Sequence, residues 1–209
     1  MSKVILLSTA YLPPIAWFQH LLHADKVYLE QCENYSKQSY RNRCRILTAN
    51  GSMDLSIPIQ HKGKQAINEV LIQEAEMWRK QHWQAICSAY GKSAFFLYYK
   101  DAFEPFFQAG SSINLFEHNL KLIQLVLRFL KVNIPIELTE RFESVPPNMV
   151  DLRNYFQAKT NVHSQELIIY KPYLQVFSEK YSFQPNLSIL DILFNQGPVS
   201  KDFLIKTEN

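Results

Sequence analysis

The first thirty residues contain two short apolar runs separated by one amphipathic stretch. Val4–Leu7 is entirely apolar, which is typical of a strand buried on both faces. Pro13 and Pro14 favour the first turn of a helix, and the apolar residues that follow continue at helical spacing to about Ala24. Val27–Leu29 is the second apolar run. This order predicts a parallel strand–helix–strand unit.

A β-hairpin is predicted around Asn50–Gly51, because Asn-Gly between two strand-like runs is the strongest short-range signal for a two-residue turn. With this dipeptide at the tip, Cys44 would pair with Ile57 and Arg45 with Ser56. The alternation of a strand then separates an apolar core face, which includes Cys44 as a packing residue, from a face that carries arginines.

The remainder of the chain is predicted to be mostly helical. Apolar spacing and the following Gly91 indicate a helix from Glu74 to Tyr90, and the aromatic-rich segment Phe95–Gln108 is expected to be helical in part. The other expected elements are a strand at Ile67–Gln73, a surface connection at Pro135–Val150, a short helix at Arg153–Asn161 and a helix at Ser188–Asn195 closed by Gly197 and Pro198.

The longest apolar stretch, Ile113–Val132, is predicted to be an amphipathic helix with Ser111 or Ser112 as its cap. Its polar residues recur at steps of four and three and so form one stripe. They are Glu117, Lys121, Gln124, Arg128 and Lys131. We therefore expect no membrane span, and Val4–Leu7 is too short for the core of a signal peptide.

These elements predict an α/β fold. An N-terminal strand–helix–strand unit and the hairpin would form one sheet, followed by a mostly helical C-terminal half. A chain of 209 residues with 47% hydrophobic content can bury a sizeable core. We expect one domain over residues 1–209, in which residues 148–209, after Pro146 and Pro147, form a helical appendage on the same core.

Charge and cysteine content limit the partners and the compartment. The net charge is only +3, so general attraction to nucleic acid is weak and an anion must be bound by a local cluster. Cys32, Cys44 and Cys87 form no CxxC pair, which favours a reducing compartment such as the cytoplasm. No P-loop, nucleophile elbow or paired metal-ligand motif occurs, so neither a metal nor a cofactor is expected.

The basic stretch Tyr35–Arg45 is the first candidate site. It holds four basic side chains and no acid. In the predicted hairpin Arg41, Arg43 and Arg45 would project from one face, and a guanidinium can hold phosphate or carboxylate oxygens with two N–H groups. Asn42 would lie on the opposite face and completes this candidate group. The alternative is a strand edge kept soluble by its charge, and the sequence favours neither.

Ser8, Thr9 and Tyr11 form the second candidate group. They lie between the first strand and the first helix, where open α/β sheets bind ligands and where the helix amino terminus favours an anion. The alternative is an ordinary strand–helix connection, which the lack of a Gly-rich phosphate loop favours.

Several motifs together resemble the WbqC-like family of bacterial proteins. They are Ala10–Pro14, Ala24–Asp25, Tyr40–Arg43, Asn50–Gly51 with Leu55–Pro58, Trp78–His82 with Tyr90 and Phe95–Phe96, and Asn186–Pro198. The likeness covers nearly the whole chain. The chain departs from the family at Ser8 and Thr9, where many members carry Gln-Pro, and Glu30 stands where an acidic residue is expected.

The resemblance implies a role in the synthesis of bacterial surface polysaccharide. The family's name comes from O-antigen gene sets, and its members are associated with transfer of an amino-acyl or similar group to a nucleotide-linked amino sugar. The expected function is a cytoplasmic transferase acting on a nucleotide-linked sugar or an activated acyl donor. The arginines would hold phosphate, Tyr11 and Tyr40 would orient the sugar or base, and Glu30 or His82 would accept a proton.

Two other functions use the same residues. One is a non-catalytic module of a glycan-assembly complex, with a protein partner on the aromatic residues between Phe95 and Phe107. The other is nucleic-acid binding through the arginines, with Tyr35 and Tyr40 stacking on bases. The small net charge disfavours the second of these.

Overall fold

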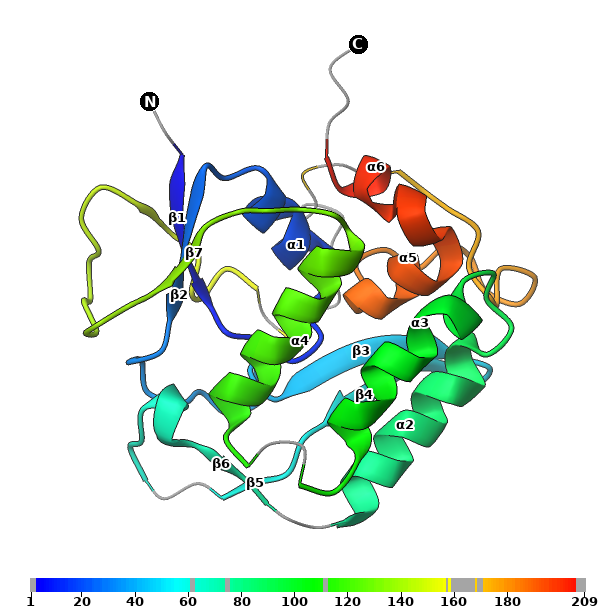
Figure 1. Cartoon of the computed structure of the whole chain (residues 1–209), viewed down its shortest axis with the longest axis horizontal. Coiled ribbons are helices and arrows are strands. Elements are labelled where there is room, and N and C mark those ends of the chain that lie inside the picture. Colours follow the sequence, from blue (N-terminus) through cyan, green and yellow to red (C-terminus); the bar gives the residue numbers. More distant parts are fainter. Residues whose placement is uncertain are drawn as a thin grey trace.

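A four-stranded parallel sheet lies on one side of the molecule (Figure 1). The computed structural model describes residues 3–60, 63–73, 76–110, 113–156, 158, 168 and 171–205. Within these residues the strands are β1 (Val4–Ser8), β2 (Lys26–Glu30), β7 (Ile136–Leu138) and β8 (Val150–Asp151), in the order β7-β2-β1-β8. The predicted α/β class is confirmed.

The predicted strand–helix–strand unit is confirmed. Strands β1 and β2 pair in parallel from Val4 opposite Lys26 to Ser8 opposite Glu30, and helix α1 (Ile15–Leu22) connects them. Pro14 precedes the helix in an extended conformation. The side chains of β1 are buried after its first residue, as expected for an all-apolar run in a parallel sheet.

The short strands β7 and β8 replace part of the predicted surface connection between Pro135 and Val150. β7 pairs with β2, and β8 pairs with β1. β7 has three residues and β8 has two, which is too few for a periodic pattern to be recognised in the sequence. Because the chain passes from β1 to β2 and β7 on one side and then to β8 on the other, the strand order reverses beside β1.

The hairpin is present, but it forms its own two-stranded ladder and does not extend the parallel sheet as predicted. It consists of β3 (Arg43–Thr48) and β4 (Gly51–Ser56). The turn is Ala49–Asn50, so Arg45 faces Asp54, two positions away from its predicted partner. Gly51 has φ +102°, which suits a turn followed by a left-handed glycine rather than a turn centred on Asn-Gly.

The predicted separation of the hairpin into an apolar face and a polar face is confirmed. A shift of the strand pairing by two residues leaves each side chain on the same face. Cys44 and Ile46 are buried, and burial raises the pKa of the Cys44 thiol.

Next along the chain, β5 (Ile59–Gln60) pairs with β6 (Leu71–Ile72). The predicted strand at Ile67–Gln73 is therefore only partly correct, because the 3₁₀ turn η1 (Ile67–Glu69) occupies its first half.

The helices occupy the predicted regions. They are α2 (Glu76–Tyr90), α3 (Phe96–Phe103) with η2 (Glu104–Phe107), α4 (Leu115–Phe129), and α5 (Ile189–Gln196) with η4 (Gly197–Val199) and α6 (Ser200–Leu204). Asn114 caps α4 by accepting a hydrogen bond from Glu117 N at 3.0 Å. The predicted caps Ser111 and Ser112 lie outside the described residues. Arg153–Tyr155 form a turn in place of the predicted helix, whose later part, Gln157 and residues 159–161, is not described.

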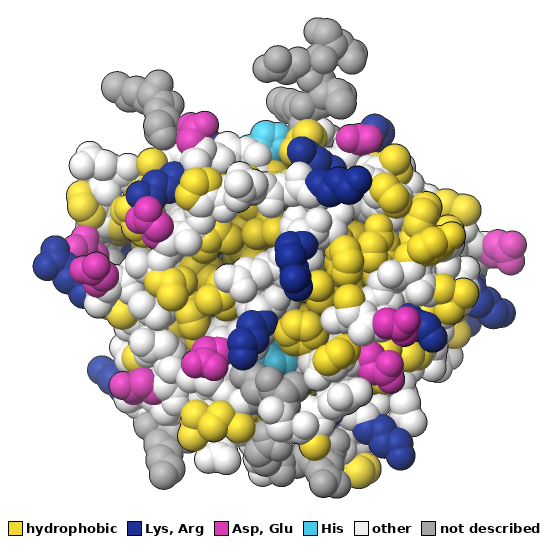
Figure 2. Space-filling view, viewed as in Figure 1, with side chains coloured by type: hydrophobic (Ala, Val, Ile, Leu, Met, Phe, Trp, Pro, Cys, Tyr) yellow, Lys and Arg dark blue, Asp and Glu magenta, His cyan; other side chains and the backbone are white. Residues whose placement is uncertain are grey.

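The polar stripe predicted for α4 is exposed along its whole length, and basic side chains follow the helix across one face of the molecule (Figure 2). Among the described residues no helix is long and apolar enough to cross a membrane.

The aromatic residues of α3 belong mainly to the core, so they do not form the continuous contact surface considered from the sequence. Phe96 and Phe103 are buried, and their ring centroids lie 5.3 and 5.6 Å from that of Phe194 on α5. The exposed large side chains of this helix are Leu97 and Tyr98. α5 therefore packs on the same core as α3.

Candidate functional site

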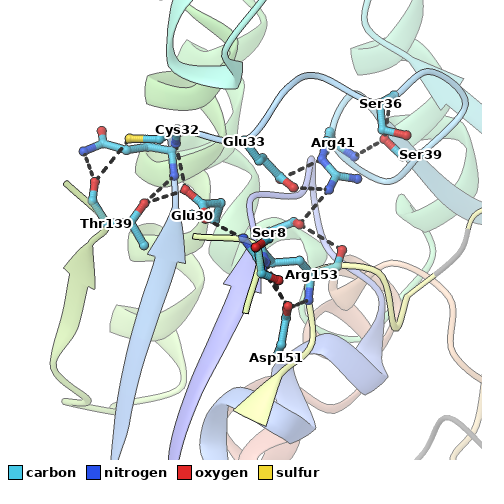
Figure 3. Close-up of polar contacts among 12 residues, drawn as sticks. Ser8, Glu30, Cys32, Glu33, Ser36, Ser39, Arg41, Thr139, Asp151 and Arg153 are labelled. Atoms are coloured by element: carbon cyan, nitrogen blue, oxygen red, sulfur yellow. Dashed lines mark hydrogen bonds and ion pairs between the residues drawn. The ribbon is translucent and has the colours of Figure 1, made fainter. Parts of the chain in front are cut away.

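A cluster of charged side chains lies at the carboxyl edge of the parallel sheet (Figure 3). Ser8 ends β1, Glu30 ends β2 and Asp151 ends β8, while Arg153 follows β8 after one residue. This edge flanks the reversal of strand order, which is where open α/β sheets bind ligands.

Two carboxylates hold Arg153 in place. Its Nε and Nη2 donate to the two oxygens of Asp151 at 3.0 and 2.6 Å, and its Nη1 donates to Glu30 Oε2 at 3.0 Å. Hydrogen bonding to Arg153 lowers the pKa of Asp151. Because the Arg153 side chain is only 4% exposed, these partners compensate the cost of taking its charge out of water.

Glu30, the predicted proton acceptor, has both oxygens engaged. Oε1 accepts from Cys32 N at 2.9 Å and from Thr139 Oγ1 at 2.6 Å, and Oε2 accepts from Arg153. The residue is 1% exposed. This geometry suits a residue that positions Arg153 and Thr139.

Arg41 does not lie on the hairpin strand: it precedes β3 by two residues and is buried. Its Nε and Nη2 form a two-point ion pair with Glu33 at 2.8 and 2.5 Å, and Nη2 also donates to Ser8 Oγ at 2.8 Å. Ser8 Oγ in turn donates to the carbonyl of Arg153 at 2.9 Å. Ser8 and Arg41, which belonged to two separate candidate groups in the sequence, are therefore in direct contact.

A hollow of about 230 Å³ opens above Arg41 and Arg153. The described residues that line it include three cations and no carboxylate. They are Ser36, Lys37, Gln38, Ser39, Arg41, Arg153, Asn154, Phe156 and Ala158. We call this the basic hollow.

A small cavity of about 10 Å³, close to the size of one water molecule, shares Arg41, Arg153 and Phe156 with the basic hollow and is also lined by Ser8, Thr9 and Tyr40. Thr9 is 1% exposed, and its Oγ1 has no hydrogen-bond partner among the described residues. A buried hydroxyl of this kind calls for an explanation, since such groups are normally paired.

A second hollow, of about 500 Å³, lies on the other side of Glu30. Its charged lining residues are mostly acidic: Glu30, Glu137, Glu140 and Glu143, with Arg141. The ion pair between Glu30 and Arg153 therefore stands between an acidic and a basic hollow.

The prediction of a row of arginines without an acidic neighbour is wrong. Arg45 pairs with Asp54 through two hydrogen bonds of 2.7 and 3.2 Å, and Arg43 Nη1 lies 3.6 Å from the same carboxylate. Neither arginine is among the described residues that line the basic hollow. The turn at Ala49–Asn50 brings Asp54 opposite Arg45, which the predicted register did not. Asn42 is held locally through a bond from Nδ2 to the carbonyl of Ile57 at 2.8 Å.

Tyr11, Tyr40 and His82 are core residues. Tyr11 is fully buried, and its Oη lies 3.0 Å from His82 Nδ1. Burial raises the pKa of Tyr11 and lowers that of His82 to about 4, so His82 is neutral near pH 7. Nearby His118 is 0% exposed, and burial lowers its pKa to about 3. Tyr40 is 5% exposed.

Glu33, Asp151 and Arg153 were missed by the sequence interpretation. Asp151 ends a two-residue strand whose residues are both exposed, and Arg153 follows it, so no run of buried apolar residues marked a strand end in the sequence. Glu33 lies in a segment without periodicity, between β2 and β3. The short distance in sequence between Glu33 and Arg41 was the one available indication of their pairing.

These features define an α/β protein with a polar site at the carboxyl edge of a short parallel sheet. The chain matches the WbqC-like protein family over residues 9–149 and 144–203, and it belongs to that family. It is also similar to the uncharacterized protein Rv1507c of Mycobacterium tuberculosis, with 28% identity over 230 residues and 98% of each chain covered. No solved structure matches it.

Proposed function

We propose that this protein is a group transferase that holds a phosphate-bearing substrate in the basic hollow. The substrate class is a nucleotide-linked sugar or an activated acyl donor of surface-polysaccharide synthesis, and the compartment is the cytoplasm. The observation that carries the proposal is the position of Lys37, Arg41 and Arg153 around one hollow at the carboxyl edge of the sheet. Cationic side chains without a competing acid in the lining suit phosphate oxygens.

Preorganisation of the arginines supports this proposal. Glu33 fixes Arg41, and Asp151 with Glu30 fixes Arg153, so little side-chain freedom is lost when an anion binds. These three carboxylates reduce the local net charge, which weakens the electrostatic attraction between the hollow and an anion. Lys37 is exposed and adds a cation that the described carboxylates do not pair.

A transferase also needs room for an acceptor, and the hollow beyond Glu30 offers it. In acyl transfer, an acceptor amine would bond to the acyl carbon while the bond to the leaving group breaks. The leaving group keeps the bonding electron pair, and the amine proton passes to water. We assign Glu30 to positioning Arg153, and His82 to the core, because both side chains are buried and bonded.

Calorimetry tests the proposal directly. Titration with UDP-sugars and with acyl adenylate analogues should give heat for one of these classes, and Lys37→Ala should weaken that binding about tenfold, the loss of one hydrogen bond to a charged group. Lys92→Ala is the matched control, because Lys92 is also exposed and lies in the turn after α2, outside the residues that line the basic hollow. Absence of heat with both classes contradicts the proposal.

A further inference from the structure

We infer that the basic hollow recognises the sugar phosphate part of its ligand and leaves the nucleobase outside. This inference rests on the proposed function and narrows its substrate class. The size of the hollow is the first argument: at about 230 Å³ it is smaller than the 300–1,000 Å³ typical of pockets for drug-sized ligands. A complete nucleotide sugar therefore exceeds the space.

The second argument is the absence of a stacking platform among the described lining residues. Bases without sequence-specific contacts are usually held by stacking on an accessible aromatic ring. The one aromatic residue of the basic hollow, Phe156, is 9% exposed. Its ring already packs against His20 and Tyr155, with centroids 5.4 and 5.0 Å away.

The remaining lining groups suit a phosphorylated sugar. Arg41 uses Nε and Nη2 for Glu33 and Ser8, which leaves Nη1 without a hydrogen bond to the described residues and available for an oxyanion. The amides of Gln38 and Asn154 are exposed at the same hollow, and each offers both a donor and an acceptor to sugar hydroxyls.

The floor of the hollow provides one further contact. Thr9 Oγ1 is buried and lacks a partner among the described residues, and it lines the small cavity that adjoins Arg41 and Arg153. That cavity admits one oxygen atom or water, not a phosphate group. We assign it to a phosphate oxygen, or to a water that bridges this oxygen to Thr9.

The test compares ligands that share a sugar and differ in the base. Calorimetry with glucose, galactose and N-acetylglucosamine 1-phosphates, their UDP derivatives and GDP-glucose should give, for the sugar that binds, dissociation constants within about threefold for the sugar phosphate and its nucleotide forms. Uridine alone should give no heat. Lys37→Ala should weaken every bound ligand about tenfold, and Thr9→Val should weaken them while the protein stays folded.

Tyr155→Ala separates the outcomes, because Tyr155 is the exposed aromatic residue next to Phe156. Unchanged binding of nucleotide sugars in this variant supports the inference. If a UDP-sugar binds tenfold or more tightly than its sugar 1-phosphate, or loses that advantage in Tyr155→Ala, the inference fails while the proposed function stands. If no sugar phosphate, nucleotide sugar or acyl adenylate binds, both fail.

Discussion

Arg153 Nη1 donates a 3.0 Å hydrogen bond to Glu30 Oε2, which joins the segment after β8 to the end of β2 across the edge of the sheet. Both side chains are less than 5% exposed. Removing one partner of a buried pair costs about 3–5 kcal/mol, because the other charge stays buried without its partner.

Glu30→Ala should lower the free energy of unfolding by only part of that amount, measured by urea denaturation, because Arg153 keeps its two hydrogen bonds to Asp151. Glu137→Ala is the control, since Glu137 forms an exposed pair with Lys26 and such pairs contribute little. Equal effects of the two substitutions would contradict a structural role for the Glu30–Arg153 pair.

Arg41→Lys should weaken both folding and anion binding although it keeps the charge. A lysine cannot reproduce the two-point contact with Glu33 and the third bond to Ser8. We expect a lower urea midpoint and weaker binding of the phosphate-bearing ligand. A variant with unchanged midpoint and affinity would show that the Arg41 geometry is not required.

Arg43→Ala should leave ligand binding unchanged. The sequence alone placed Arg43 among the candidate phosphate contacts, whereas the structure places it beside Asp54 and Ser56. Weaker binding in Arg43→Ala, with binding unchanged in Lys37→Ala, would show that the anion site lies on the hairpin.

Gly197→Ala should destabilise the protein more than Gly63→Ala. Both glycines have positive φ, +56° and +67°, so an alanine at either is strained, and the ψ of −127° at Gly197 adds a combination that only glycine adopts readily. At Gly197 a Cβ would also lie 2.4 Å from the ring of Phe95, while at Gly63 it meets no atom within 4 Å. Equal urea midpoints would contradict this packing.

Stability should fall as the pH decreases from about 6.5 towards 4. Burial lowers the pKa values of His82 and His118 to about 4 and about 3, so the unfolded chain binds protons in this range while the folded chain does not. The slope is at most about 1.4 kcal/mol per pH unit for each histidine.

Asp191 acts in the opposite direction, because burial raises its pKa to about 6 and its protonation therefore favours the folded state at low pH. The comparison of His118→Phe with the parent protein isolates the histidine contribution. Urea midpoints at pH 7 and 4.5 should differ less in the variant, and an identical pH dependence would show that His118 does not titrate as proposed.

The sequence predicted the fold better than it predicted the site. Val4–Leu7 is an unbroken apolar run, and the helix after Pro14 and the polar stripe of α4 carry periodic signals; each of these elements is present. The site depends on contacts without local signals. Arg41 pairs with Glu33, and a one-residue shift of the turn moves the strand pairing by two positions and brings Asp54 opposite Arg45.

Amide NMR with inorganic pyrophosphate tests the central claim, that the anion site is the basic hollow, most directly. We predict shift changes for the amides of residues 36–41 and 153–156, and none along β3 and β4. Changes confined to Arg43–Ser56, or no saturable change anywhere, would contradict it.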